Sequence, residues 1–147
     1  MKLPTTFRYG ARCVVELAAV AEHRPVSLRE LAECQKVSAK YLEHIFRALR
    51  AAGLVLAVRG MHGGYMLARP ADRITLKEVY EALAGSTAPV ECVDCRESCP
   101  MHESCFMIDT WAELKQAIDD VLTRTTLREL VDRKRRKQAA VTQMYYI

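Results

Sequence analysis

Apolar side chains recur near the start of the chain at the spacing of an amphipathic helix. Over residues 5–22 they follow one another at steps of four, four and three, at Tyr9, Cys13, Leu17 and Val20. Such steps place side chains on one face of a helix. We therefore predict a helix over residues 5–22, in which Cys13 packs as a small apolar residue.

Two shorter helices follow, and both have recognisable ends. Ser27 and Glu30 form a capping box at the start of a helix that ends near Gln35. The next helix begins at Ser38 and stops at Gly53. Its apolar face consists of Leu42, Ile45, Phe46 and Leu49. Two short helices joined by a tight turn, the second of them amphipathic and basic, predict a helix-turn-helix.

A glycine-rich hairpin is predicted in the stretch LVLAVRGMHGGYMLA, with strands over residues 54–58 and 65–68. A phosphate-binding loop is excluded, because no GK[ST] motif follows and no helix opens after the glycines. A hairpin directly after a helix-turn-helix predicts a winged helix. At the tip of this wing, Arg59 and His62 are suited to contact the phosphate backbone or a narrow minor groove of DNA.

The helix over residues 38–53 is predicted to lie in the major groove of double-stranded DNA. Its candidate DNA-contacting residues are Ser38, Lys40, Tyr41, Glu43, His44 and Arg47. DNA is thus the expected partner, and neither a membrane nor a small-molecule substrate is expected.

A longer helix is predicted over residues 106–123, with an apolar stripe at heptad-like spacing. The stripe consists of Met107, Trp111, Leu114, Ile118 and Val121. In a chain of 147 residues, a long helix after a complete winged helix is better explained by pairing with the same helix of a second copy than by burial against its own domain. We therefore predict a homodimer. A last short helix begins at the capping box of Thr126 and Glu129 and runs into RKRRK, which is expected to be a solvated tail.

The distribution of charge agrees with a DNA-binding first half. The net charge is +4, but residues 1–70 hold 11 Lys and Arg against 5 Asp and Glu, whereas residues 71–147 hold 11 against 13. A basic head on a near-neutral body indicates nucleic-acid binding. No apolar run approaches the ~20 residues that span a bilayer, and the N-terminal stretch lacks a signal-peptide core. We expect a cytoplasmic protein, and no catalytic constellation indicates an enzyme.

Four of the six cysteines crowd into the stretch CVDCRESCPMHESC, at Cys92, Cys95, Cys99 and Cys105. In a reducing compartment this favours metal binding or redox chemistry over disulfides. Thiolates select zinc, copper(I) or iron–sulfur clusters. Zinc ribbons usually combine two CxxC pairs ~15–20 residues apart, whereas this loop has one CxxC pair with two cysteines close behind. An iron–sulfur cluster, [2Fe–2S] or [4Fe–4S], is therefore preferred to zinc.

Four sequence features together resemble the IscR/NsrR/CymR family of bacterial winged-helix regulators, over about residues 1–132. They are RYGAR, VSLRELAECQKVSAKYLEHIFRALRAAGLV, VRGMHGGYMLARP and a cysteine loop before a Trp-bearing helix. The resemblance implies a homodimer on palindromic promoter DNA. It also implies that Lys40, Tyr41 and Glu43 read bases and that Arg59 enters the minor groove. In several members a loop-bound iron–sulfur cluster senses iron–sulfur status, nitric oxide or redox stress.

The ligand pattern departs from that family. Cluster-binding relatives commonly have C-x5-C-x5-C, and here Val93 stands at the first position, between Cys92 and Cys95. The further ligand in relatives is a histidine after the last cysteine or an acidic residue near the partner's N-terminus, and those positions are Ile108 and Arg8. We therefore predict that all four loop cysteines are ligands within one subunit. His102 is the reserve ligand, followed by Asp109.

The sequence predicts a dimeric transcription regulator, with a repressor preferred to an activator, whose promoter binding is gated by an iron–sulfur cluster. A zinc-stabilised or thiol-switch regulator of the same fold is the alternative. An iron–sulfur electron-transfer protein is a second alternative, although it would not need a winged helix. The predicted units are a winged helix-turn-helix over 1–84, a cysteine-rich loop over 85–105, dimerisation helices over 106–132 and a basic tail over 133–147.

Overall fold

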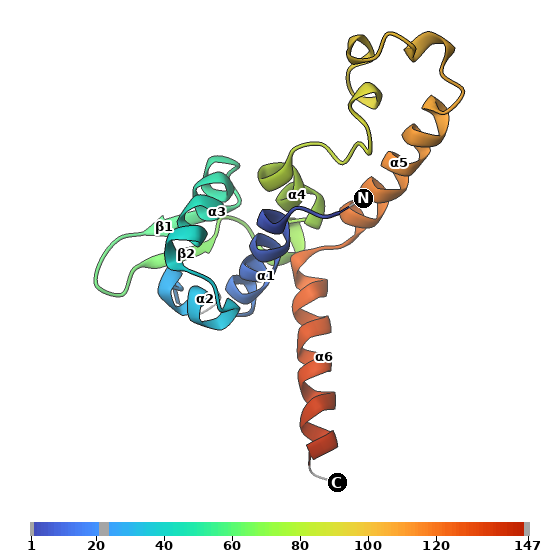
Figure 1. Cartoon of the computed structure of the whole chain (residues 1–147). Helices are drawn as coiled ribbons and strands as arrows, with labels where there is room; N and C mark the ends of the chain where they lie inside the picture. Colours follow the sequence, from blue (N-terminus) through green and yellow to red (C-terminus); the bar gives the residue numbers. More distant parts are fainter. Residues whose placement is uncertain (1, 21–23, 146–147) are drawn as a thin grey trace.

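The computed structural model describes residues 2–20 and 24–145, which contain six α-helices and one two-stranded antiparallel sheet (Figure 1). The helices are α1 (Thr5–Val20), α2 (Leu28–Gln35), α3 (Ala39–Ala51), α4 (Leu76–Ala84), α5 (Ile108–Arg124) and α6 (Leu127–Tyr145), and the strands are β1 (Val55–Val58) and β2 (Gly64–Leu67). The prediction of a mainly α fold with a small β wing is confirmed. Residues 21 and 22, the end of the first predicted helix, lie outside the described residues. None of the described helices is both long and apolar enough to cross a membrane.

Helix α1 lies at the centre of the head and packs against α2, α3, α4, α6 and β2. Cys13 and Leu17 are fully buried on its inner face, as the sequence predicts. The predicted apolar face of α3 is also fully buried, at Leu42, Ile45, Phe46 and Leu49. Burial of these side chains is the main stabilising contribution to the head, because apolar area removed from water is favourable by ~25 cal/mol per Å².

Reciprocal hydrogen bonds fix the starts of α2 and α4. At α2, Ser27 Oγ accepts from Glu30 N at 3.2 Å, and Glu30 Oε2 accepts from Ser27 N at 2.9 Å. Thr75 and Glu78 repeat this arrangement at α4, at 3.3 Å and 2.9 Å. Each box satisfies amide groups that the first turn of a helix leaves without partners. The predicted capping box at Ser27 and Glu30 is confirmed, and Thr75 and Glu78 form a second one.

The wing is seated on the head through backbone bonds. Beyond the β1–β2 ladder, Val26 N donates to Tyr65 O at 3.0 Å and Tyr65 N donates to Val26 O at 2.8 Å. This pairing requires glycine at position 64, because a Cβ atom there would lie 2.3 Å from Val26 O. The Tyr65 ring also packs on Phe46 of α3, with centroids 4.7 Å apart. The hairpin is therefore held against both helices of the helix-turn-helix.

Helix α5 extends away from the head and begins at Ile108, so Met107 precedes it. Leu122 is its buried residue, and Ile118 packs at the edge of the core. Leu114 and Val121 are 44% and 47% exposed. The head therefore covers one side of α5 and leaves much of the predicted apolar stripe open.

Helix α6 is longer than the sequence predicts. Thr126 Oγ1 accepts from Glu129 N at 3.2 Å at its predicted start, but the helix continues to Tyr145. The basic run over residues 133–137, expected as a tail, is therefore helical. Leu127 and Val131 are buried in the head core, and Lys134 forms an ion pair with Glu16 of α1. These contacts anchor the first half of α6, and its second half projects from the head (Figure 1).

Candidate DNA-binding surface and cysteine-rich loop

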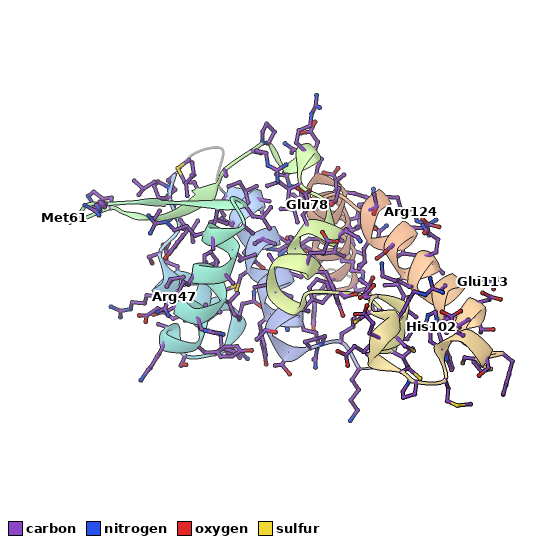
Figure 2. All side chains as sticks on the ribbon, turned by 90° about the horizontal axis from the view of Figure 1, so that it is seen from above. Arg47, Met61, Glu78, His102, Glu113 and Arg124 are labelled. Atoms are coloured by element: carbon purple, nitrogen blue, oxygen red, sulfur yellow. The ribbon has the colours of Figure 1, made fainter. Side chains whose placement is uncertain are left out.

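Helix α3 presents a polar face to solvent, as the sequence predicts. Lys40, Glu43, His44 and Arg47 are exposed. Arg47 projects outward from α3 on the side of the molecule that also carries the wing (Figure 2). Within the described residues these four side chains form no hydrogen bond or ion pair, so their polar groups are available to an external partner.

Ser38 and Tyr41, also predicted to contact DNA, have structural contacts as well. Ser38 Oγ accepts from Tyr41 N at 3.1 Å and so caps α3. The Tyr41 ring is half-buried and meets Tyr9 of α1 edge to face, with centroids 5.9 Å apart. These two residues position the start of α3 against α1, which fixes where the exposed face points.

The wing tip places Arg59 and His62 in solvent, on either side of Met61. Met61 is 95% exposed and lies at the far end of the hairpin (Figure 2). The sequence reasoning did not single out this residue, although an apolar side chain between Gly60 and His62 in a turn was a visible signal. An apolar side chain at such a tip can contact the sugars and base edges of a minor groove.

The cysteine-rich loop consists of three short 3-10 turns. They are η2 (Glu91–Val93), η3 (Arg96–Ser98) and η4 (His102–Ser104). Cys92 lies within η2, Cys95 and Cys99 flank η3, and Cys105 follows η4. All four are free thiols. Cys95 is exposed, whereas Cys92, Cys99 and Cys105 are half-buried.

The four thiols share one loop but do not form a closed cage. Among the described residues, no three His, Cys, Asp or Glu side chains come together as a metal site. The loop nevertheless suits a metal group in its donors, since it offers four thiols and the Nδ1 atom of His102, which is buried without a hydrogen-bond partner. Asp109 is exposed in the first turn of α5. The ligand assignment made from the sequence stays a prediction.

The remaining two cysteines lie in the head. Cys13 is fully buried, and burial, aided by Cys34 and Glu16, raises the pKa of its thiol to about 12. Such a thiol is unreactive at neutral pH. Cys34 lies one residue before the end of α2 and is exposed.

Asp119 of α5 connects the loop region with the head. Its carboxylate accepts from Thr87 Oγ1 at 2.5 Å, lies 3.1 Å from Lys77 Nζ of α4 and lies 3.2 Å from Lys115 Nζ. Lys115 in turn lies 3.9 Å from Asp94, next to η2 in the loop. Burial raises the pKa of Asp119, but the hydrogen bonds from Thr87, Lys77 and Lys115 outweigh it, so the pKa is lowered. The sequence reasoning missed this cluster.

The fold and the exposed face define the class of the protein. A helix-turn-helix with a seated wing and a polar α3 face is the architecture of winged-helix DNA-binding regulators. Residues 3–133 match the Rrf2 family, described as iron-dependent transcriptional regulators. The chain belongs to the Rrf2 family of helix-turn-helix transcriptional regulators, as its resemblance to IscR and CymR predicted.

Individual relatives agree with this assignment. The chain is 39% identical over 131 residues to Protein rrf2 of Nitratidesulfovibrio vulgaris, covering 89% of this chain and 87% of the relative. It is 37% identical over 134 residues to the regulator IscR of Pectobacterium atrosepticum, covering 91% and 81%. The structure of CymR, the global cysteine regulator of Bacillus subtilis, matches with a TM-score of 0.75 at 34% identity, covering 90% of this chain and 97% of that one. The relatives CymR and IscR are named as transcriptional regulators, in agreement with the prediction of a protein that is not an enzyme.

The DNA-binding surface yields a testable prediction at Arg59. Replacing Arg59 with Ala removes a cation at the wing tip, so we expect DNA affinity to fall by roughly tenfold and the salt dependence of binding to lose about one unit of slope. Fluorescence anisotropy with promoter DNA at several salt concentrations measures both. Arg135→Ala, an exposed cation on α6, is the matched control. Equal effects of the two substitutions would contradict a specific role for the wing tip.

Proposed function

We propose that this protein is a homodimeric regulator whose binding to a palindromic promoter site is gated by an iron–sulfur cluster in the cysteine-rich loop. The observation that carries the proposal is that four free thiols share one loop whose base is tied to the DNA-binding head through Lys115 and Asp119. The iron-dependent description of the family supports it. Control of transcription then follows from the state of the loop.

The half-buried thiols of Cys92, Cys99 and Cys105 would hold the cluster together with a fourth donor, for which the sequence predicts Cys95. Four soft donors in one short loop suit an iron–sulfur cluster, because a cluster spreads its metal atoms over more volume than a single zinc ion. When bound, it supplies chemistry that responds to electrons, oxygen and nitric oxide. The protein's part is to hold the group in a partly exposed loop where such signals reach it.

A physical route leads from this loop to the DNA-binding surface. The loop and the wing tip of one copy lie at opposite ends of the molecule in both views, so an effect of the loop on its own wing must travel through the head (Figures 1 and 2). The Asp119 cluster bridges them, since Lys115 reaches Asp94 in the loop and Lys77 belongs to α4, which packs on α1 and α3. A change in loop conformation that moves Asp94 therefore alters a charge network seated on the head.

The dimer is proposed from the orientation of α5. Its contacts with the head fall on Leu122, Asp119 and Ile118, so Leu114 and Val121 point away from that side and stay exposed. Exposed leucine and valine along a long helix favour pairing with the same helix of a second copy. Pairing sets the separation of the two α3 helices, which must match one turn of DNA, ~34–36 Å.

A thiol-switch regulator is the second candidate. Cys34 and Cys95 are exposed free thiols and so are open to oxidants. In that case reversible oxidation, and not a cluster, would alter the fit to DNA. Iron and sulfide analysis separates the two candidates, because a thiol switch needs neither.

The first experiment concerns the cluster itself. We expect protein purified without oxygen to be brown, to contain iron and acid-labile sulfide, and to change its affinity for promoter DNA by about tenfold on loss of the cluster. Cys99→Ser should lose iron and sulfide while keeping the helical circular-dichroism spectrum. Colourless protein with stoichiometric zinc, or full metal content in Cys99→Ser, would refute the proposal.

The route through Asp119 is tested by Asp119→Asn. The amide keeps the shape but loses the charge that holds Lys77 and Lys115, so the cluster should remain while the tenfold difference between loaded and cluster-free protein shrinks toward one. Anisotropy titrations of both forms give this ratio. Asp120→Asn is the control, since Asp120 is exposed and, among the described residues, accepts a hydrogen bond only from Gln116, at 2.7 Å, within its own helix. An unchanged ratio in Asp119→Asn would exclude this route.

The dimer is tested by Leu114→Glu. A charge in the paired stripe should raise the dimer dissociation constant by about 30-fold or more, or about 2 kcal/mol. Light scattering coupled to gel filtration would then show a species of the monomer mass, 16.6 kDa, at concentrations where the unchanged protein is dimeric. Leu56→Glu, on the exposed face of the wing, should leave the mass unchanged. A Leu114→Glu variant that stays dimeric would locate the interface elsewhere.

A further inference from the structure

We propose that Met61, at the tip of the wing, is an apolar wedge that enters the minor groove of DNA and opens one base-pair step. The wing then selects a flexible step beside the bases that α3 contacts. The inference rests on DNA binding by the winged helix and needs neither the cluster nor the dimer of the proposed function. It follows from the exposure of Met61, from the backbone that holds it and from the charges beside it.

The backbone of the wing tip is a tight turn that contains Met61. Gly63 N donates to Gly60 O at 3.1 Å, so Met61 and His62 are the two central residues of a four-residue turn. Gly60 has a φ of 121°, which residues with a side chain rarely adopt, and a Cβ atom at Gly63 would lie 2.3 Å from Val58 O. The turn therefore depends on glycine at both ends, and it carries Met61 at the far end of the hairpin (Figure 2).

Met61 lies almost entirely in solvent. It is 95% exposed, which is the highest value among the exposed large apolar residues that the structure describes. Single apolar residues on a surface are common, but the residues that usually form the tip of a tight hairpin are Gly, Asn and Asp. A long, flexible thioether side chain at this position is suited to burial against an external partner.

The charges around Met61 indicate that this partner is DNA. Arg59 and His62 are exposed on either side of it, and residues 54–71 contain two arginines but no Asp or Glu. The negative potential of a narrow minor groove attracts such cations. Arg47 of α3 projects on the side of the molecule that also carries the wing, so one duplex can contact both elements (Figure 2).

DNA can bury an apolar side chain between two neighbouring base pairs. Proteins that bind the minor groove frequently insert Phe, Leu, Ile or Met there, which partly unstacks the step and kinks the duplex. The TA and CA/TG steps open most easily. Arg59 then supplies charge, and Met61 supplies a preference for a step that opens easily, without a hydrogen bond to any base edge.

The preference is tested by selecting binding sites from a library of random duplexes, with cluster-loaded and cluster-free protein. The unsubstituted protein should enrich a TA or CA/TG step at a fixed distance outside the bases that α3 contacts, and Met61→Ala should lose this enrichment. In the selected duplex, exchange of the flexible step for an AA step should weaken binding of the unsubstituted protein by about fivefold or more. In Met61→Ala this ratio should lie close to one, as measured by fluorescence anisotropy.

Opening of the step is measured with 2-aminopurine at its adenine, because the emission of this base rises when it is unstacked. The unsubstituted protein should raise the emission by about threefold or more. Met61→Leu keeps an apolar wedge and should do the same, whereas Met61→Ala should leave the emission near that of the free duplex. Met144→Ala is the matched control, because Met144 is a 78% exposed methionine on α6, and it should behave like the unsubstituted protein.

The outcomes separate the wedge from DNA binding itself. An unchanged step preference in Met61→Ala, or no rise in emission with the unsubstituted protein, would overturn the wedge. A loss of affinity in Met61→Ala that is equal for every step would also overturn it, because Met61 would then be a general contact. If neither form of the protein enriched any sequence, DNA binding and the wedge would fail together. Circular dichroism of Met61→Ala should match that of the unsubstituted protein, since Met61 is almost fully exposed.

Discussion

One partly buried carboxylate, that of Asp119, ties the helix that carries the cysteine-rich loop to the DNA-binding head. The side chain of Asp119 is 14% exposed. Its carboxylate accepts hydrogen bonds from Thr87, just after α4, and from Lys115 of α5, and it forms an ion pair with Lys77 of α4. Burial of an unpaired carboxylate would be costly, but three donors satisfy it, so its charge is kept. Besides this cluster, α5 meets the head through Leu122 and Ile118, and the residues after it pair with the head through the backbone bonds of Leu76 N to Thr125 O and Leu127 N to Ile74 O. The Asp119 cluster is the side-chain contact that ties α5 and, through Lys115 and Asp94, the loop to α4.

The two sides of α5 have different tasks. The side with Asp119 and Leu122 belongs to the head, and the side with Leu114 and Val121 is open. A helix that is anchored on one side and apolar on the other can transmit a displacement of the loop to whatever packs on its open side. In the proposed dimer that neighbour is the second copy, so the loop would act on the separation of the two heads as well as on its own head.

The sequence predicted the elements of the head well because their determinants are local. The capping boxes at Ser27 and Thr75, the apolar face of α3 and the glycine turn of the wing each depend on residues a few positions apart. The length of α6 was missed, because the run over residues 133–137 was interpreted by its charge. That run contains good helix formers, no Pro or Gly follows it, and the ion pair of Lys134 with Glu16 anchors it.

The site was less predictable, because it depends on contacts between distant positions. Thr87 and Asp119 are 32 positions apart, and nothing in the periodicity of α5 distinguishes Asp119 from its neighbour Asp120. The cysteine spacing identified the loop, but only the folded turns show Cys95 exposed and His102 Nδ1 buried. The spacing of the cysteines along the chain shows which side chains share the loop, whereas their burial depends on how the loop folds.

The seating of the wing at Gly64 has a further implication. Main-chain bonds between Val26 and Tyr65 fix the base of the hairpin, and the absent Cβ of Gly64 lets the two backbones approach closely, so the backbone and not the tip side chains sets where the wing leaves the head. Substitutions at the tip then change which side chains can meet a DNA groove without changing where the wing is attached to the head.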